Sequence, residues 1–247
     1  MFAIFKKDLR AYFINPIGSV YIGIFLAVSG LICAFTTIQQ ASYDTTSYFQ
    51  FMIFTFAVLI PLLTMRLFSE ERKTRTEQLL LTAPVSITGM VMGKYLAALT
   101  LFASSVLVSC INLFPLVSYS IIEQSNATSD VHVGLVGGQV IGCLIGVLLV
   151  GAAFIAVGLF ISSLTESQLS AAVITIAVLV VMMLANFFNS VINSTVIRTV
   201  LNWVSVLARY ERFAMGMFDF AALLYYASIA GVFIFLTVRI YEKRRWG

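Results

Sequence analysis

Long runs without a charged residue alternate with short polar segments along the chain. These runs extend over residues 11–43, 45–65, 95–122, 131–165, 167–197 and 220–238. A helix that crosses a bilayer needs roughly 20 apolar residues. The pattern therefore predicts an all-α integral membrane protein with six transmembrane helices, at residues 17–38, 48–68, 91–118, 137–163, 170–188 and 220–240.

The composition supports this prediction and limits what else the chain can contain. Of its 247 residues, 60% are hydrophobic and only 11% are charged, whereas a soluble domain has about 25% charged residues. Six spans take up about half of the chain. Only short loops remain, so we expect one membrane domain over 1–247 and no separate nucleotide-binding, metal-binding or nucleic-acid-binding domain.

The positive charges predict the orientation of the chain in the membrane. Twelve of the 15 Lys and Arg residues fall in three groups at one predicted membrane face: Lys6, Lys7 and Arg10; Arg66, Arg72, Lys73, Arg75 and Lys94; Arg239, Lys243, Arg244 and Arg245. Positive residues are enriched in cytoplasmic loops. Both termini are therefore expected in the cytoplasm, which requires an even number of spans.

Residues 1–16 predict an amphipathic helix lying on the inner leaflet. Phe2, Phe5, Leu9 and Phe13 share one side at helical spacing, and the opposite side carries basic residues expected to contact membrane lipid. These membrane-surface anchors are Lys6, Lys7 and Arg10. Asn15-Pro16 is expected to end the helix before the first span.

Residues 69–84, between the second and third spans, form the most charged segment. Ser69 is a suitable N-cap, Glu70 and Glu71 favour a helix start, and Pro84 would end the helix. Two interpretations remain open from these residues: a solvated connector, or a docking element that uses the apolar residues 79–81 as a contact. Pro61, in the preceding span, is expected to kink that span or leave a local gap in its hydrogen bonding.

A glycine stripe marks the start of the fourth span. Its members are spaced by four residues: Gly134, Gly138, Gly142 and Gly146. Such a stripe permits close helix packing, which can serve packing within the chain, a dimer seam or a moving interface. The segment 189–217 is expected to form helices at or re-entering the outer membrane interface, because it mixes aromatic residues with three arginines.

The chemistry of an enzyme is mostly missing from the sequence. The string GMVMGKY at 89–95 is one residue short of a Walker A loop and has Tyr95 where Ser or Thr belongs, so Lys94 is interpreted as an inner-face anchor. His132 is the only histidine, in an expected outer loop.

No ionisable residue lies near the middle of a predicted span, and ion-driven carriers usually place such groups there. Energy for transport would then have to come from a separate ATPase.

Three sequence blocks resemble one known family. They are RLFSEER at 66–72, continued by TEQLL at 76–80, TAPVS at 82–86 and GKY at 93–95; GLFISSLTESQ at 158–168; and the ending from Arg212 to Asp219, with Tyr225-Tyr226 and Arg244-Arg245-Trp246. Together they resemble the permeases of type-2 ABC exporters. The closest branch resembles the permeases associated with gliding motility.

The resemblance implies a six-helix permease of a bacterial inner membrane that pairs with a second copy or a similar permease and binds two cytoplasmic ATPase subunits. Residues 1–16 would be the elbow helix, 69–84 the coupling helix, the loop at 165–168 a second inner contact, and 189–217 the outer re-entrant helices. ATP and Mg²⁺ would bind to the ATPase partner and not to this chain. The implied coupling residues are Glu70, Glu71, Arg72, Thr76, Glu77, Leu79, Leu80, Thr165 and Glu166.

The predicted function is the membrane subunit of an ATP-driven exporter, with no catalytic residue of its own. One alternative is a complex that transports nothing and passes ATP-driven motion to an auxiliary extracytoplasmic protein. A second is an intramembrane enzyme acting through His132. The identity of the substrate does not follow from the resemblance, because the matching blocks concern coupling and not cargo.

Overall fold

The computed structural model describes residues 2–14, 16–39, 45–73, 78, 86–115, 117–118, 121, 137–191 and 205–246. Within these residues the chain forms helices and no strand. The helices are α1 Phe2–Ile14, α2 Pro16–Cys33, α3 Thr45–Thr64, α4 Ser69–Lys73, α6 Ile87–Ser109, α8 Gly137–Leu164, α9 Gln168–Val191, α11 Leu207–Ala214 and α12 Phe220–Trp246.

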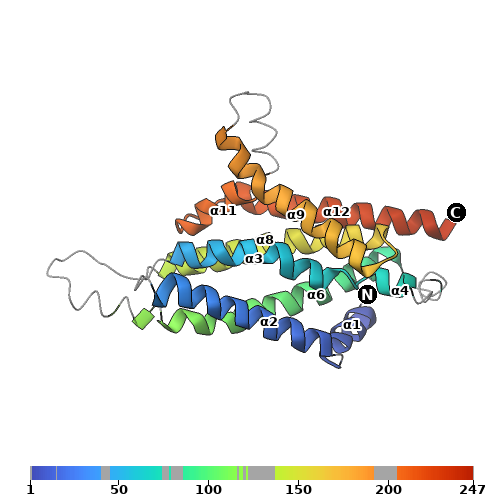
Figure 1. Cartoon of the computed structure of the whole chain (residues 1–247). Helices are drawn as coiled ribbons and strands as arrows, with labels where there is room; N and C mark the ends of the chain where they lie inside the picture. Colours follow the sequence, from blue (N-terminus) through green and yellow to red (C-terminus); the bar gives the residue numbers. More distant parts are fainter. Residues whose placement is uncertain are drawn as a thin grey trace.

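Six helical stretches of the described chain are long and apolar enough to cross a membrane, which confirms the predicted all-α class. They are Gly18–Ile38, Thr46–Lys73, Ile87–Pro115, Gly137–Leu164, Gln168–Ala185 and Phe220–Arg245. The first of them continues α2 through a π-helical turn, Ala34–Ile38. The third continues α6 through a 3₁₀ turn, Cys110–Asn112. Figure 1 shows most of these helices running along one long bundle, with α9 crossing it obliquely and both chain termini toward the same end.

The helix α8 is the central element of the bundle. It packs against α3, α6, α9, α11 and α12, and in Figure 1 it lies among the other helices. Its side chains from Val147 to Leu159 are nearly all buried. A Cβ at Gly151 would lie 2.2 Å from the Phe102 ring, and one at Gly158 would lie 2.3 Å from the Thr64 hydroxyl. Glycine at these two positions is what allows α3 and α6 to approach α8 closely.

The helix α3 passes through Pro61 without a break. Proline removes one N–H donor from a helix interior, yet the helix continues to Thr64, and the N–H of Met65 donates to the Pro61 carbonyl at 2.8 Å. Turns at residues 65–68 then lead into α4. The helix therefore does not break at Pro61 and ends one turn later, while the missing N–H of Pro61 leaves the predicted local gap in its hydrogen bonding. The predicted kink stays a prediction.

The amphipathic helix α1 has three faces where the sequence predicted two. Phe2 and Phe13 are exposed, as are Lys6, Lys7 and Arg10. Ile4 and Asp8 are buried on a third face, which packs against α6. The Tyr12 hydroxyl donates to the Leu63 carbonyl at 3.3 Å. Burial raises the pKa of the Tyr12 phenol and the nearby Asp8 carboxylate raises it further, so Tyr12 remains a neutral donor.

The helix α11 seals the end of the bundle where α8 begins. A Cβ at Gly142 would lie 2.6 Å from the Phe213 carbonyl oxygen, and one at Gly146 would lie 2.9 Å from the Tyr210 ring. Nothing lies within 4 Å of a Cβ at Gly138. Gly134 is outside the described residues. Two members of the glycine stripe thus pack against a helix of the same chain, which is the first of the three interpretations left open.

Candidate functional site at the charged end of the bundle

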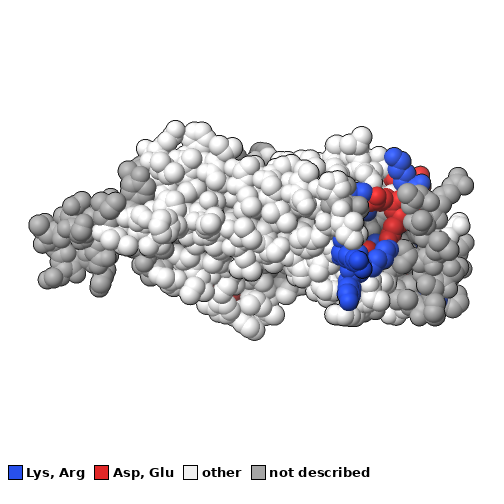
Figure 2. Space-filling model, turned by 90° about the horizontal axis from the view of Figure 1, so that it is seen from below, with Lys and Arg blue, Asp and Glu red and all other residues white. Residues whose placement is uncertain are grey.

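Charged side chains gather at one end of the molecule, where α1, α4, α6, α8 and α12 meet. Figure 2 shows blue and red atoms together at this end, beside a long white surface. The short helix α4 lies directly after the turns that end α3. Because α4 belongs to the predicted coupling segment, its contacts show which other helices would move together with that segment.

Ser69 anchors α4, although not as the N-cap that the sequence predicted. Its hydroxyl donates back to the Met65 carbonyl. The N–H groups of Phe68 and Ser69 instead donate to the Ser162 hydroxyl of α8, at 3.2 and 3.3 Å. Ser69 is itself the first residue of α4, and its N–H finds its partner on α8. The N-cap of α6 is Ser86, which accepts from the Gly89 N–H at 3.3 Å.

Lys94, which the sequence indicated as an inner-face anchor, is buried at the centre of this end and not exposed on its surface. Its residue exposure is 2%. Its ammonium donates to Glu71 Oε1 at 2.7 Å and to the Leu67 carbonyl at 2.9 Å, and it lies 5.1 Å from the centre of the Phe68 ring. Lysine carries its charge on a long flexible stem. That stem reaches from α6 to α4. The spacing of residues along the sequence does not reveal such a contact.

Asp8 completes a cluster that sequence reasoning missed. Its Oδ2 lies 3.6 Å from the Lys94 ammonium, and the Asp8 side chain is 12% exposed. Lys7 lies 3.8 Å from Asp8 and 3.7 Å from Glu71 and remains exposed. We call Asp8, Glu71 and Lys94 the charged core. It joins α1, α4 and α6 by ion pairs.

The sequence carried little signal that Asp8 is buried. Residues 2–14 contain a single acidic residue among Lys6, Lys7 and Arg10. An acidic residue between lysines on a surface helix is usually solvated. Only its four-residue spacing from Ile4 indicated a buried position.

Arg72 connects α4 with the turn between α8 and α9. Its Nη2 lies 2.8 Å from Glu166 Oε1, and its Nη1 donates to the Leu164 carbonyl at 3.1 Å. Glu166 is mostly exposed, and the Thr165 hydroxyl donates to the Ile161 carbonyl within α8. The two inner segments named by the resemblance therefore touch through one arginine. We call this contact the Arg72–Glu166 link.

Three further contacts lie at this end of the molecule. Glu70 pairs with Arg66 at 2.5 Å, within the chain segment from α3 to α4. Arg244 of α12 donates to the Ser163 carbonyl of α8 at 2.8 Å. Phe68 and Tyr241 place their ring centres 4.7 Å apart, which packs the turns before α4 against α12. These contacts tie α12 to α8 and to the turns before α4.

Several predicted residues lie outside the described part of the chain. They are Thr76, Glu77, Leu79, Leu80 and His132. Of the predicted coupling helix 69–84, the structure therefore describes α4 and residue 78, and of the predicted outer re-entrant segment 189–217 it describes residues 189–191 and 205–217. Among the described residues, no group of three or more His, Cys, Asp or Glu side chains is arranged to hold a metal ion.

The fold and this site define a class of protein: a multi-pass α-helical membrane protein with a charged end. A family model described as "ABC-2 family transporter protein" matches residues 21–244, which is most of the chain. The chain therefore belongs to the ABC-2 transporter family and is a permease subunit, not a catalytic one. Among curated proteins, none matches the chain significantly.

Proposed function

We propose that this permease couples ATP hydrolysis on a cytoplasmic partner to the export or movement of a substrate across a bacterial cytoplasmic membrane. The observation that carries the proposal is the Arg72–Glu166 link, because it joins the two segments to which the resemblance assigns ATPase contact. A subunit that pushes on either segment would move both. The buried charged core would pass that movement to α1 and α6.

The orientation belongs to the same proposal. The charged end would face the cytoplasm, with both termini there. Two observations support it: both chain termini lie toward this end (Figure 1), and basic residues of α1, α4 and α12 gather there. An excess of Lys and Arg favours the cytoplasmic side.

A second permease copy, or a similar permease, would complete the pathway. The helices α2 and α9, the first and fifth spans, carry exposed apolar side chains along much of their length, among them Leu31, Phe35, Val173 and Val181. Two ATPase subunits would bind ATP and Mg²⁺, one beneath each permease. The resemblance of residues 66–86 and 158–168 supports the gliding-motility-associated branch.

The test compares charge reversal at the two ends of the molecule. Glu166→Lys changes the exposed acid of the proposed ATPase contact, and Glu211→Lys changes an exposed acid of α11 at the opposite end. We expect the wild-type chain to copurify with a subunit that contains a Walker A loop. Glu166→Lys should reduce its retention about tenfold, the effect of an interface anchor, and Glu211→Lys should leave it unchanged. The proposal would be refuted if the wild-type chain copurified with no ATPase subunit, or if both variants retained that subunit equally well.

A further inference from the structure

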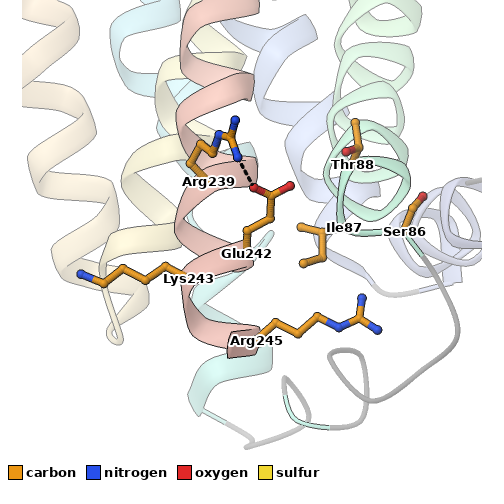
Figure 3. Close-up of a pocket in the computed structure, with 7 residues that line it drawn as sticks. All are labelled: Ser86, Ile87, Thr88, Arg239, Glu242, Lys243 and Arg245. Atoms are coloured by element: carbon orange, nitrogen blue, oxygen red, sulfur yellow. Dashed lines mark hydrogen bonds and ion pairs between the residues drawn. The ribbon is translucent and has the colours of Figure 1, made fainter. Parts of the chain in front are cut away.

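A cavity of about 600 Å³ lies between the start of α6 and the last turns of α12. Figure 3 shows its residues on the two facing helices: Ser86 and Thr88 on α6, and Arg239, Glu242, Lys243 and Arg245 on α12. None of these residues belongs to the charged core or to the Arg72–Glu166 link. The proposed coupling function does not use this cavity.

The cavity has an excess of positive charge. Three of its side chains are cationic and only Glu242 is acidic. Glu242 Oε2 lies 2.7 Å from Arg239 Nη1, and the Arg239 side chain remains 63% exposed. A guanidinium has five N–H donors, so one carboxylate contact leaves others available. Arg245 extends toward the Ser86 side of the gap in Figure 3.

The α6 side offers hydroxyl groups. The Ser86 oxygen accepts from the Gly89 N–H at 3.3 Å, which leaves the Ser86 proton free to be donated. Thr88 adds a second hydroxyl. Cations on one wall and hydroxyl donors on the other match the oxygens of a phosphate group, which accept several hydrogen bonds.

The apolar surface next to the cavity indicates a lipid as the source of that phosphate. Val232, Phe235 and Leu236 are exposed. They lie three to seven residues before Arg239, on the same face of α12 by helical spacing. The Arg239 guanidinium lies 5.0 Å from the centre of the Phe235 ring. An acyl chain can run along this face while its headgroup reaches the cations at the end of the helix.

We propose that this cavity binds the phosphate of an anionic phospholipid, whose acyl chains lie along α12. The charged ligands are Arg239 and Arg245, and Ser86 and Thr88 donate from the opposite wall. In Figure 3 the Lys243 ammonium points away from the gap, so Lys243 adds positive charge nearby without contacting the phosphate. Basic pockets between membrane helices are suited to such headgroups. A lipid held there would bridge α6 and α12.

The experiment measures binding of phosphatidylglycerol to the full chain in detergent by native mass spectrometry, with zwitterionic phosphatidylethanolamine, whose net charge is zero, as the comparison. The site variant is Arg239→Gln with Arg245→Gln. The matched control is Lys73→Gln with Arg212→Gln, which removes the same charge from exposed positions outside the cavity. We expect the site variant to lose phosphatidylglycerol affinity about tenfold or more, and the control to lose less than twofold. Equal losses, or no loss in the site variant, would overturn the proposal.

Two further arms test the ligand assignment. Glu242→Gln removes the only carboxylate of the cavity, so it should strengthen phosphatidylglycerol binding; unchanged or weaker binding would contradict the role of Arg239. Inorganic phosphate should not displace phosphatidylglycerol at millimolar concentrations, because it lacks the acyl chains. Displacement at those concentrations would identify a free-anion site and overturn the lipid assignment. Near-wild-type thermal unfolding of each variant establishes that it is folded.

Discussion

The two ends of the helix bundle are held together by different forces. At the charged end, the Lys94 ammonium lies 2.7 Å from the Glu71 carboxylate and 3.6 Å from the Asp8 carboxylate, which joins three helices. At the opposite end, α11 lies directly on Gly142 and Gly146 of α8, where a Cβ would find no room. One end depends on a buried cluster of charged side chains, whereas the other combines close backbone approach with one exposed ion pair, between Arg212 and Asp219 at 2.6 Å.

Neutral hydrogen bonds add to the packing at the end opposite the charges. The Asn112 amide donates to the Ser29 hydroxyl at 3.0 Å and to the Tyr48 hydroxyl at 3.5 Å, and the Cys33 thiol donates to the Asn112 carbonyl at 3.4 Å. These bonds tie α2, α3 and the turn after α6.

The difference indicates which end can respond to a partner. An ion pair weakens or re-forms when another charge approaches, whereas a close steric contact changes only if a helix moves away. An ATPase that brings charged groups to α4 would therefore act on adjustable contacts. The end sealed by α11 would serve as the fixed part against which the charged end moves.

The largest expected effect comes from Lys94→Met, which removes the cation from the charged core. Asp8 and Glu71 then remain close together and mostly buried without Lys94. Removing one partner of a buried ion pair costs about 3–5 kcal/mol. We expect a large loss of thermal stability in detergent. The triple variant Lys94→Met, Asp8→Asn, Glu71→Gln should recover most of it, and wild-type stability of Lys94→Met alone would show that the core contributes nothing.

The next effect tests the opposite end. In Gly142→Ala the new methyl group would meet the Phe213 carbonyl oxygen at 2.6 Å, so α11 must shift, at a cost of about 1–3 kcal/mol. Gly138→Ala is the matched control, because open space surrounds that position and alanine is favoured over glycine in a helix by about 0.5–1 kcal/mol. Thermal unfolding should move in opposite directions for the two variants. A shift in the same direction would contradict the steric account.

Asn112→Ala should have a smaller effect, because it removes neutral hydrogen bonds. Side-chain hydrogen bonds between membrane helices average about 0.6 kcal/mol. Ser118→Ala is a suitable control, since the Ser118 hydroxyl is exposed and donates only to the Phe114 carbonyl of its own helical turn. Equal stability of the two variants would show that the Asn112 bonds do not hold α2 and α3 in place.

The sequence predicted the six spans because charge-free runs follow from the thickness of the bilayer, which is a one-dimensional constraint. It also predicted α1 and the start of α4 from local patterns. It did not predict that Lys94 is buried, because the charges that stabilise it come from positions 8 and 71, far away in sequence. The role of Ser69 was missed for the same reason, since its N–H bonds to Ser162 on α8. Proximity in space decided both cases, and periodicity carries no signal of it.

The smallest effect on stability, and the most informative one for function, is expected at the Arg72–Glu166 link. Glu166 is 76% exposed in this pair, and exposed ion pairs contribute about 0–1 kcal/mol. Arg72→Gln and Glu166→Gln should therefore unfold close to the wild-type temperature.

If the link passes movement between α4 and the α8–α9 turn, each variant should still lower permease-stimulated ATP hydrolysis in the copurified complex. The double variant should lower hydrolysis no further than either single variant, because all three lack the same contact. The exchanged pair Arg72→Glu with Glu166→Arg should restore part of the stimulation, although it loses the bond to the Leu164 carbonyl. Additive losses in the double variant, with no recovery in the exchanged pair, would mean that Arg72 and Glu166 act separately and that the two inner segments are not coupled through this contact.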